Sequence, residues 1–316
     1  MDIEIIEVGP RDGLQNEPVI VPTAAKVAYI RSLIAAGLRR VEAVSFVHPR
    51  RVPQMADAEE VMARVPRVPG VRYAGLVLNE RGLDRALRAG VDEVNAVVVA
   101  TETFSQRNQG MCVDDAVAGF GVIAVRAREA GLRVTLTVAA AFGCPFEGEV
   151  APDLVAGIVR RCPGAQEIAL ADTIGVGVPA DVRRLAAAVR EVSPLPLRFH
   201  FHNTRNTGYA NAVAALESGA VALDASAGGI GGCPFAPAAT GNIATEDLAY
   251  LLHRSEIATG VDLAGVLAAA ELVEAALGTR VPAQLGRAGI WPDSRALHNP
   301  AARSTVRNTV SFSPDQ

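Results

Sequence analysis

Short apolar runs alternate along the whole chain with longer amphipathic stretches rich in Ala, Leu and Arg. The runs contain many Val and Ile residues, which favour strands, and the stretches between them show the spacing of amphipathic helices. The alternation is fairly regular and predicts successive β-α units around a parallel sheet. We count eight strand candidates, at residues 3–8, 40–46, 72–78, 93–100, 133–141, 167–172, 197–202 and 222–227.

Glycines mark the ends of several helical stretches, in "AAGLRRVEAV", "RAGVDEV", "EAGLRV" and "ESGAVAL". Glycine takes the left-handed conformation that ends a helix, so each segment reads as a helix end followed by a strand. Eight such units without a linker favour a closed (β/α)₈ TIM barrel that spans residues 1–279. An open, doubly wound sheet is the alternative fold.

The chain continues beyond the eighth unit. A helical stretch at 260–278 follows it, and residues 280–316 are rich in Pro, Asn and Ser. We expect an extra C-terminal helix and then a polar tail that is loose or packs on a neighbouring subunit of a possible homodimer.

Composition removes several classes of function. The net charge is −4, with acidic and basic residues interspersed, and aromatic residues make up 4% of the chain. No nucleic-acid surface is therefore predicted. Charged residues and glycines interrupt the apolar runs before bilayer length, and the acidic N-terminus does not resemble an export signal. Four widely spaced cysteines without a CxxC pair fit a reducing compartment. We therefore expect a cytoplasmic protein with no membrane partner.

The single lysine argues against imine chemistry. Lys26 lies in "PTAAKVAYI", a predicted first helix, whereas a Schiff-base lysine is expected at a strand end in a desolvated pocket.

Polar residues at the strand ends indicate where the chemistry lies, because barrel enzymes place it at the carboxyl ends of their strands. In "LRFHFH" the two histidines, His200 and His202, point to the same side of one strand. Asp12 follows the first strand, and Asn242 lies in the loop after the eighth. One carboxylate, two imidazoles and one amide oxygen predict a divalent cation site for Mg²⁺ or Mn²⁺.

Structural roles remain open for each of these residues. The histidine pair could simply pack within the barrel, Asp12 could pair with Arg11, and Asp172 could cap the helix after "ADTIGVG". Glu42 could be a buried charge partner. Cys233, in the glycine-rich loop after the eighth strand, could be an inert hydrophobic residue.

The chain resembles the 3-hydroxy-3-methylglutaryl-CoA lyases, whose superfamily also holds isopropylmalate and homocitrate synthases. The resemblance extends through about residue 278. It rests on "EVGPRDGLQNE", "VEAVSFVHPRRVPQMAD", "FGCPFEG", "LADTIGVG", "HFHNT", "GGIGGCPFAPAATGNIATEDLAYLL" and "TGVDL". It implies a metal-dependent TIM-barrel lyase that cleaves 3-hydroxy-3-methylglutaryl-CoA, or a close analogue, to acetyl-CoA and acetoacetate.

The resemblance also implies roles for individual residues. The metal ligands would be Asp12, His200, His202 and Asn242. Arg11 would be the electrophilic catalyst, Cys233 the acid on a flexible loop, and Glu42 and Asp172 active-site carboxylates. Arg107 and Asn108 match positions that meet the nucleotide part of CoA. The base that takes the hydroxyl proton would come from the neighbourhood of Asp172, from Asp12 or from a histidine-linked water.

Some positions depart from the family pattern. Asn203 stands where the family usually has Asp, and Arg205 and Asn206 replace Tyr-Gly. Pro18 and Gln106 replace basic residues. A charge from Arg205 at the mouth would alter the acyl group accepted. Citramalyl-CoA is therefore an alternative substrate, a condensing synthase an alternative enzyme, and a catalytically silent metal-binding or assembly protein an alternative of another class.

Overall fold

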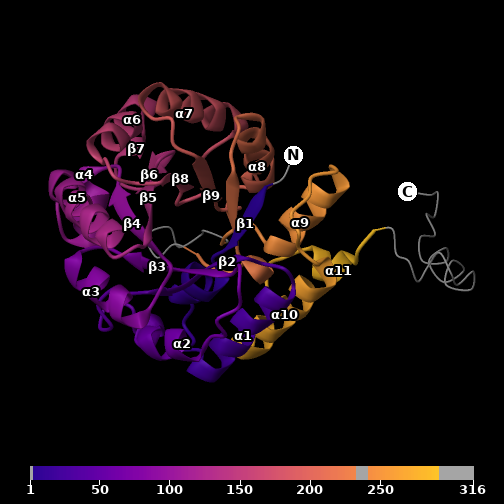
Figure 1. The fold of residues 1–316 in the computed structure, drawn as a ribbon. Coiled ribbons are helices and arrows are strands. Elements are labelled where there is room, and N and C mark those ends of the chain that lie inside the picture. The colour runs from indigo at the N-terminus through magenta and orange to yellow at the C-terminus, as the bar shows by residue number, and fades with distance from the viewer. Residues whose placement is uncertain (1–2, 233–240, 292–316) are drawn as a thin grey trace, which may run out of the picture.

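Eight parallel strands close into a barrel at the centre of the molecule (Figure 1). The structure is a computed structural model that describes residues 3–232 and 241–291. β1 pairs with β10 on one side and with β2 on the other, so the ring is complete. The predicted TIM barrel is confirmed and the open sheet is wrong. The barrel strands are β1 (Glu4–Glu7), β2 (Arg40–Ser45), β3 (Arg72–Val77), β4 (Glu93–Val99), β5 (Arg133–Ala139), β8 (Glu167–Asp172), β9 (Leu197–Phe201) and β10 (Ala222–Ala225).

Helices surround the barrel and connect consecutive strands (Figure 1). The stretches between strands fold as predicted, and α10 packs against α1 where the first and last units meet. The helices are α1 (Thr23–Ala35), α2 (Ala58–Arg64), α3 (Glu80–Ala89), α4 (Glu102–Gln109), α5 (Val113–Glu129), α6 (Pro152–Arg161), α7 (Pro179–Val192), α8 (Gly208–Glu217), α9 (Thr245–Arg254), α10 (Leu263–Leu277) and α11 (Leu285–Ala288).

The glycines expected at helix ends adopt the conformation that their position requires. Gly37 follows α1 with φ of 98°, and Gly90 follows α3 with φ of 69°. A side chain at Gly37 would also place its Cβ 2.2 Å from the carbonyl oxygen of Gly260. The helix ends therefore depend on glycine both for backbone conformation and for space.

Smaller elements shape the end of the barrel where the strands terminate. A single π-helical turn, η1 (Gly9–Gly13), follows β1, and a 3₁₀ turn, η3 (Ala227–Gly229), follows β10. Another 3₁₀ turn, η2 (Pro53–Met55), precedes α2. A two-stranded hairpin of β6 (Gly143–Cys144) and β7 (Gly148–Glu149) follows β5. These turns carry residues beyond the strand ends, as is usual at the functional end of such a barrel.

The C-terminal helix predicted at 260–278 is α10, which begins at Leu263 and ends at Leu277. Part of the predicted tail lies against the barrel, because the backbone N–H groups of Gln284 and Leu285 both donate to Asp247 of α9. Residues 292–316 lie outside the described residues. The division into residues 1–279 and 280–316 stays a prediction.

The barrel interior is charged, which the apolar strand pattern did not predict. At the amino ends of the strands, Arg40 donates from Nη1 and Nη2 to the two carboxylate oxygens of Glu167, at 2.8 and 2.6 Å. Its Nε donates to Glu93 at 2.7 Å. We call Arg40, Glu93, Thr135 and Glu167 the barrel floor. Their side chains are almost fully buried, so the strands must supply their own counter-charges.

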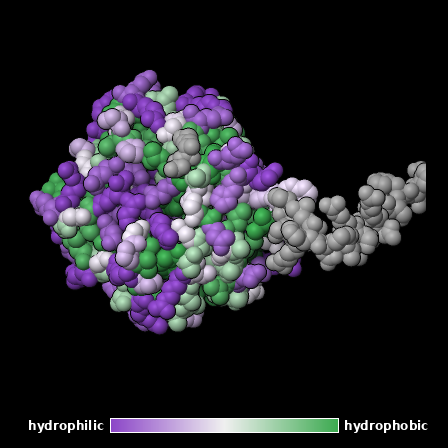
Figure 2. Space-filling view, turned by 45° about the vertical axis from the view of Figure 1, so that its right-hand side comes forward, coloured by the Kyte–Doolittle hydropathy of each residue, from purple (hydrophilic) through white to green (hydrophobic). Residues whose placement is uncertain are grey.

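The outer surface carries both hydrophilic and hydrophobic residues. Figure 2 shows hydrophilic and hydrophobic residues interspersed over the visible face. Within residues 3–232 and 241–291, no helix is long and apolar enough to cross a membrane. Cytoplasmic location and a homodimer stay predictions.

Candidate active site

Three predicted ligands converge at the other end of the barrel. Asp12 comes from η1, and His200 and His202 lie at the end of β9. The Nε2 atoms of the two histidines are 3.1 Å apart, and Oδ2 of Asp12 lies 3.8 and 3.9 Å from them. This cluster could hold a metal ion, since its ligand atoms all lie within 4.8 Å of one another. Neighbouring ligands of an ion with bonds of roughly 2.1 Å are about 3 Å apart.

Asn242, the fourth predicted ligand, lies beside this cluster. Its Nδ2 donates to Oδ2 of Asp12 at 2.9 Å, whereas its buried Oδ1 has no hydrogen-bond partner among the described residues. Nδ1 of His202 is likewise buried and unpaired in that part of the chain. A buried amide oxygen without a partner is costly unless a ligand satisfies it. The donor set of one carboxylate, two imidazoles and one amide therefore fits a divalent cation. We call Arg11, Asp12, His200, His202 and Asn242 the barrel mouth.

The electrostatics of the cluster suit cation binding. Burial alone would raise the pKa of Asp12, but Arg11 and the two histidines hold it at about 2, so the carboxylate is ionised. Burial, reinforced by the nearby His200, lowers the pKa of His202 to about 3. A neutral imidazole keeps the lone pair that a metal ion requires.

Asp224 orients His200, and sequence reasoning missed it. Nδ1 of His200 lies 3.1 Å from Oδ2 of Asp224, so the ring directs Nε2 toward Asp12. Asp224 faces His200 directly across the β9–β10 pair. A carboxylate behind a ligating histidine fixes the ring and its tautomer. The available signal was an acid inside an otherwise apolar strand, "ALDASA".

Arg11 extends into the same space between two carboxylates. Nη1 donates to Oδ1 of Asp12 at 2.5 Å, and Nε donates to Oε1 of Glu42. The residue is 7% exposed, so little water competes for its donors. The pairing of Arg11 with Asp12 is therefore present, and Asp12 also belongs to the group of candidate metal ligands.

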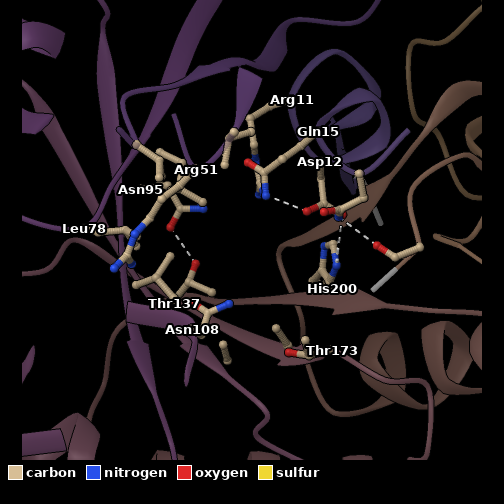
Figure 3. Close-up of a pocket in the computed structure, with 18 of the residues that line it drawn as sticks. Arg11, Asp12, Gln15, Arg51, Leu78, Asn95, Asn108, Thr137, Thr173 and His200 are labelled. Carbon is tan, nitrogen blue, oxygen red and sulfur yellow. Dashed lines mark hydrogen bonds and ion pairs between the residues drawn. The ribbon is translucent and has the colours of Figure 1, made fainter. Parts of the chain in front are cut away.

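Glu42 lies under Arg11 and is fully buried. Its Oε2 accepts from Nδ2 of Asn95 at 2.9 Å, and Oδ1 of Asn95 accepts from the Thr137 hydroxyl at 2.5 Å. Figure 3 shows Asn95 and Thr137 on one side of the cavity and Asp12 and His200 on the other. Glu42 is thus a charge partner that holds Arg11, as the structural alternative proposed.

A cavity of about 600 Å³ opens in front of these groups. Three exposed residues, Arg51, Arg107 and Asn108, line it together with Arg11, Asp12 and both histidines. The Arg107 guanidinium carbon lies 4.2 Å from the ring centroid of Phe146. Arg51 was not predicted, and its cationic side chain adds to the positive charge of this rim. The predicted pair Arg107 and Asn108 therefore lines the same cavity as Asp12, His200 and His202.

The remaining predicted carboxylate, Asp172, faces elsewhere. Its two oxygens accept the backbone N–H groups of Val176 and Gly177, both at 2.9 Å. Asp172 is fully buried and is not among the described residues that line the cavity. Asp172 thus holds the turn that precedes α7, whose own N-cap is Val178, so it does not cap the helix itself as the structural alternative supposed. Burial raises its pKa, although both backbone hydrogen bonds oppose the rise.

Three of the positions that depart from the family pattern, Asn203, Arg205 and Asn206, line a cavity behind the mouth. Nη1 of Arg205 donates to the carbonyls of Ile174 and Gly175, at 3.2 and 2.9 Å. Oδ1 of Asn203 accepts from the backbone N–H of Gly208 at 3.1 Å. Arg205 lines a second cavity, of about 810 Å³, instead of the first. Cys233 lies outside the described residues, and its neighbour Gly232 lines the main cavity.

Comparison with known proteins identifies the relatives of the chain. The family model described as HMGL-like matches residues 2–273. The hydroxymethylglutaryl-CoA lyase of Pseudomonas mevalonii is 44% identical over 96% of this chain and 98% of its own length. The (R)-citramalyl-CoA lyase of Chloroflexus aurantiacus is 42% identical over 92% of this chain and 96% of its own.

Solved structures agree with these matches. An HMG-CoA lyase from Acinetobacter baumannii, in complex with coenzyme A and 3-methylmalate, superposes with a TM-score of 0.88. It is 40% identical, and the match covers 92% of this chain and 96% of that one.

Proposed function

The chain belongs to the HMGL-like family, and from this premise we propose that it cleaves 3-hydroxy-3-methylglutaryl-CoA to acetyl-CoA and acetoacetate. It is a carbon–carbon lyase of the hydroxymethylglutaryl-CoA lyase type. The observation that carries the proposal is the placement of Arg11 beside the Asp12, His200 and His202 cluster, at one end of one cavity.

Asp12, His200, His202 and Asn242 would hold the divalent cation. When bound, such an ion acidifies a coordinated hydroxyl and fixes the orientation of the oxygens around it. The ion is Mg²⁺ or Mn²⁺ in this proposal, because nitrogen and oxygen ligands without a thiolate suit both.

Arg11 stabilises the charge that forms on the other side of the breaking bond. Cleavage of the C2–C3 bond leaves its electron pair on the thioester, whose oxygen becomes an enolate. The Arg11 guanidinium donates from Nε to Glu42 and from Nη1 to Asp12, so its orientation is set before substrate binds. Its Nη2 donates to no group within residues 3–232 and 241–291, and we assign it to that oxygen. Preorganised donors of this kind lower barriers because they need no reorientation during the reaction.

Two protons complete the reaction. The tertiary hydroxyl loses one as it becomes the carbonyl of acetoacetate, and C2 gains one as the enolate becomes acetyl-CoA. We assign the second to the Cys233 thiol, whose ordinary pKa of about 8.5 suits an acid that protonates a carbanion at neutral pH. The first passes to a group at the mouth, Asp12 or a histidine-linked water. We infer that Asp172 serves as a positioning residue for residues 173–177, because both its oxygens accept backbone N–H groups.

The rim of the cavity suits a CoA thioester. Arg51 and Arg107 offer guanidinium groups for phosphate oxygens, and Asn108 offers an amide beside them. The cavity connects this rim to Arg11, so one molecule can contact both ends. A CoA ester is therefore the substrate class that the proposal requires.

The decisive experiment is an assay of the purified protein with 3-hydroxy-3-methylglutaryl-CoA and Mg²⁺ or Mn²⁺, following acetoacetate and acetyl-CoA together. We expect equal amounts of the two products, loss of turnover after treatment with a chelator, and recovery on adding either ion. A protein that releases neither product under any of these conditions would contradict the proposal.

A second candidate substrate is citramalyl-CoA, supported by the 42% identity to the citramalyl-CoA lyase. This thioester lacks one methylene between the hydroxyl carbon and the distal carboxylate, so both oxygens can still approach the same cluster. Cleavage would release pyruvate instead of acetoacetate. The ratio of kcat/KM for the two thioesters decides between them, and we expect it to favour 3-hydroxy-3-methylglutaryl-CoA by about tenfold or more, the discrimination that one methylene allows.

A further inference from the structure

A second arginine, Arg198, lies behind the mouth at a position that no catalytic step uses. It precedes His200 by two residues on β9 and therefore faces the same side of the strand. Its partners on the neighbouring strands are Ala169 and Ala222. These small side chains leave room for a long one, and Arg198 is only 1% exposed.

Arg198 contacts the two carboxylates that support the mouth. Its Nε and Nη2 both donate to Asp224, the latter at 2.9 Å, and Nη2 also donates to Oε2 of Glu42 at 3.3 Å. Asp224 faces Nδ1 of His200, and Glu42 accepts from Nε of Arg11. The buried Arg198 guanidinium thus binds both the carboxylate that orients His200 and the carboxylate that holds Arg11.

The geometry makes each support depend on Arg198. With two donors on Asp224, the guanidinium holds the carboxylate plane so that Oδ2 stays directed at His200. A planar fork is suited to this task, whereas an ammonium group reaches one carboxylate at a time. At Glu42, the Arg198 contact and the Asn95 amide both meet Oε2, which leaves Oε1 to Arg11.

We propose that Arg198 is a positioning residue that couples the two halves of the active site, holding Asp224 against His200 and Glu42 against Arg11. The inference rests on the proposed function for its catalytic consequence, and its metal-binding consequence stands independently. Removing Arg198 would loosen both supports at once, although every side chain that touches substrate is still present in the protein.

The test replaces Arg198 by Met and by Lys in the full chain. Arg40→Met is the matched control, because Arg40 is equally buried and binds the carboxylates of Glu4, Glu93 and Glu167, yet it contacts neither Glu42 nor Asp224. Arg133→Met, which removes a partly exposed cation 3.5 Å from Glu167, is a milder control. The measurements are Mn²⁺ affinity of the metal-free protein by electron paramagnetic resonance, kcat and KM at saturating metal, and thermal unfolding.

We expect Arg198→Met to weaken Mn²⁺ binding by about 10- to 100-fold, the usual effect of losing a residue that supports a ligand. At saturating metal kcat should fall by a similar factor while KM changes little. Arg198→Lys should recover part of one effect only. Both controls should bind Mn²⁺ within about twofold of the parent, whatever their loss of thermal stability.

The inference is overturned if Arg198→Met keeps Mn²⁺ affinity and kcat within about twofold of the parent, or if Arg40→Met weakens Mn²⁺ binding equally. Should Arg198→Met not fold, Arg198→Lys decides, and unchanged affinity and turnover in that variant overturn it. A parent protein that binds Mn²⁺ but cleaves no thioester would contradict the proposed function alone, since the Mn²⁺ comparison would still test Arg198.

Discussion

At the barrel floor, Arg40 lies between two carboxylates. Its Nε donates to Glu93, and its Nη1 and Nη2 donate to Glu167. At the barrel mouth, Arg11 is held by Glu42 and Asp12 on one side only and faces a cavity on the other. Both ends bury charges of similar kind. The floor matches its carboxylates with arginines, Glu167 with Arg40 and Glu93 with Arg40 and Arg72, although Oε1 of Glu93 accepts no hydrogen bond from the described residues. At the mouth, Oδ1 of Asn242 and Nδ1 of His202 have no hydrogen-bond partner within residues 3–232 and 241–291, and both belong to candidate metal ligands.

This difference separates stability from function in one fold. Removing one partner of a buried ion pair is strongly destabilising, because it leaves an uncompensated buried charge. Buried polar groups without hydrogen-bond partners lower the stability of the ligand-free protein, and a ligand that pairs with them restores it. We therefore expect changes at the floor to alter unfolding and changes at the mouth to alter turnover.

The largest effect is expected for Arg11→Met at the mouth. Loss of the donor for the developing enolate should lower kcat by about 10²–10³-fold, the usual cost of one preorganised donor. The Asp12 and histidine cluster is unchanged, so Mn²⁺ affinity should stay within about tenfold of the parent. Steady-state kinetics and Mn²⁺ titration check the two statements. Near-normal kcat in a folded, Mn²⁺-loaded variant would remove Arg11 from the mechanism.

The next effect is at the floor, where Arg40→Met leaves Glu93 and Glu167 buried without their main counter-charge. We expect a loss of about 3–5 kcal/mol in the free energy of unfolding, typical of a broken buried ion pair. Urea unfolding of parent and variant measures it, with kcat of the folded fraction as the comparison. If kcat fell by orders of magnitude while stability hardly changed, the division between floor and mouth would be wrong.

The two regions differ in how far sequence could predict them. The strands and their order follow from apolar runs and glycine-ended helices, because local pattern determines both. Asp12, His200 and His202 could be assigned since each follows or ends a strand. The floor and Arg198 could not, because their partners come from strands far apart in sequence, as with Glu42 and Arg198. Those pairings exist only once the barrel has closed.

Asp172 shows a second limit. A strand-end acid can turn into the barrel or back onto its own loop, and the sequence "LADTIGVG" is compatible with both. The direction depends on the turn that follows, whose N–H groups at Val176 and Gly177 capture both oxygens. Cys233 remains a prediction from resemblance, since it lies outside the described residues.

The acids of the two regions should also respond oppositely to pH. At the floor, burial would raise the pKa of Glu167, but hydrogen bonds and charge from Arg40 outweigh it and lower that pKa. Near the mouth, burial raises the pKa of Glu246 to about 8, with the backbone N–H of Gly228 opposing the rise and the acids Asp247 and Glu7 adding to it. Glu246 therefore binds a proton in the folded protein at pH values where the unfolded chain has released it.

Because the folded pKa of Glu246 lies above its ordinary value, its protonation stabilises the fold at low pH, and this contribution declines from about pH 4.5 to about pH 8. Glu246→Gln imitates the protonated side chain and should flatten the pH dependence of unfolding in that window. A tenfold difference in proton affinity between the folded and unfolded chain corresponds to about 1.4 kcal/mol. For Glu167 the sign is reversed, and its contribution is lost only as the pH falls below the ordinary range of a carboxyl. Equal slopes for parent and Glu246→Gln in urea unfolding between about pH 5 and about pH 8 would contradict this account.

The smallest effect is expected at Arg205, which marks where the mouth ends. Although it follows the paired histidines closely in sequence, its guanidinium donates to the carbonyls of Ile174 and Gly175 and does not reach the main cavity. Arg205→Met should therefore change kcat/KM for 3-hydroxy-3-methylglutaryl-CoA by no more than about twofold, like other exposed substitutions away from a site. The same variant should leave the preference over citramalyl-CoA unchanged in parallel assays. A reversed preference would mean that the acyl group extends behind Asn242, and the mouth would then have to include the second cavity.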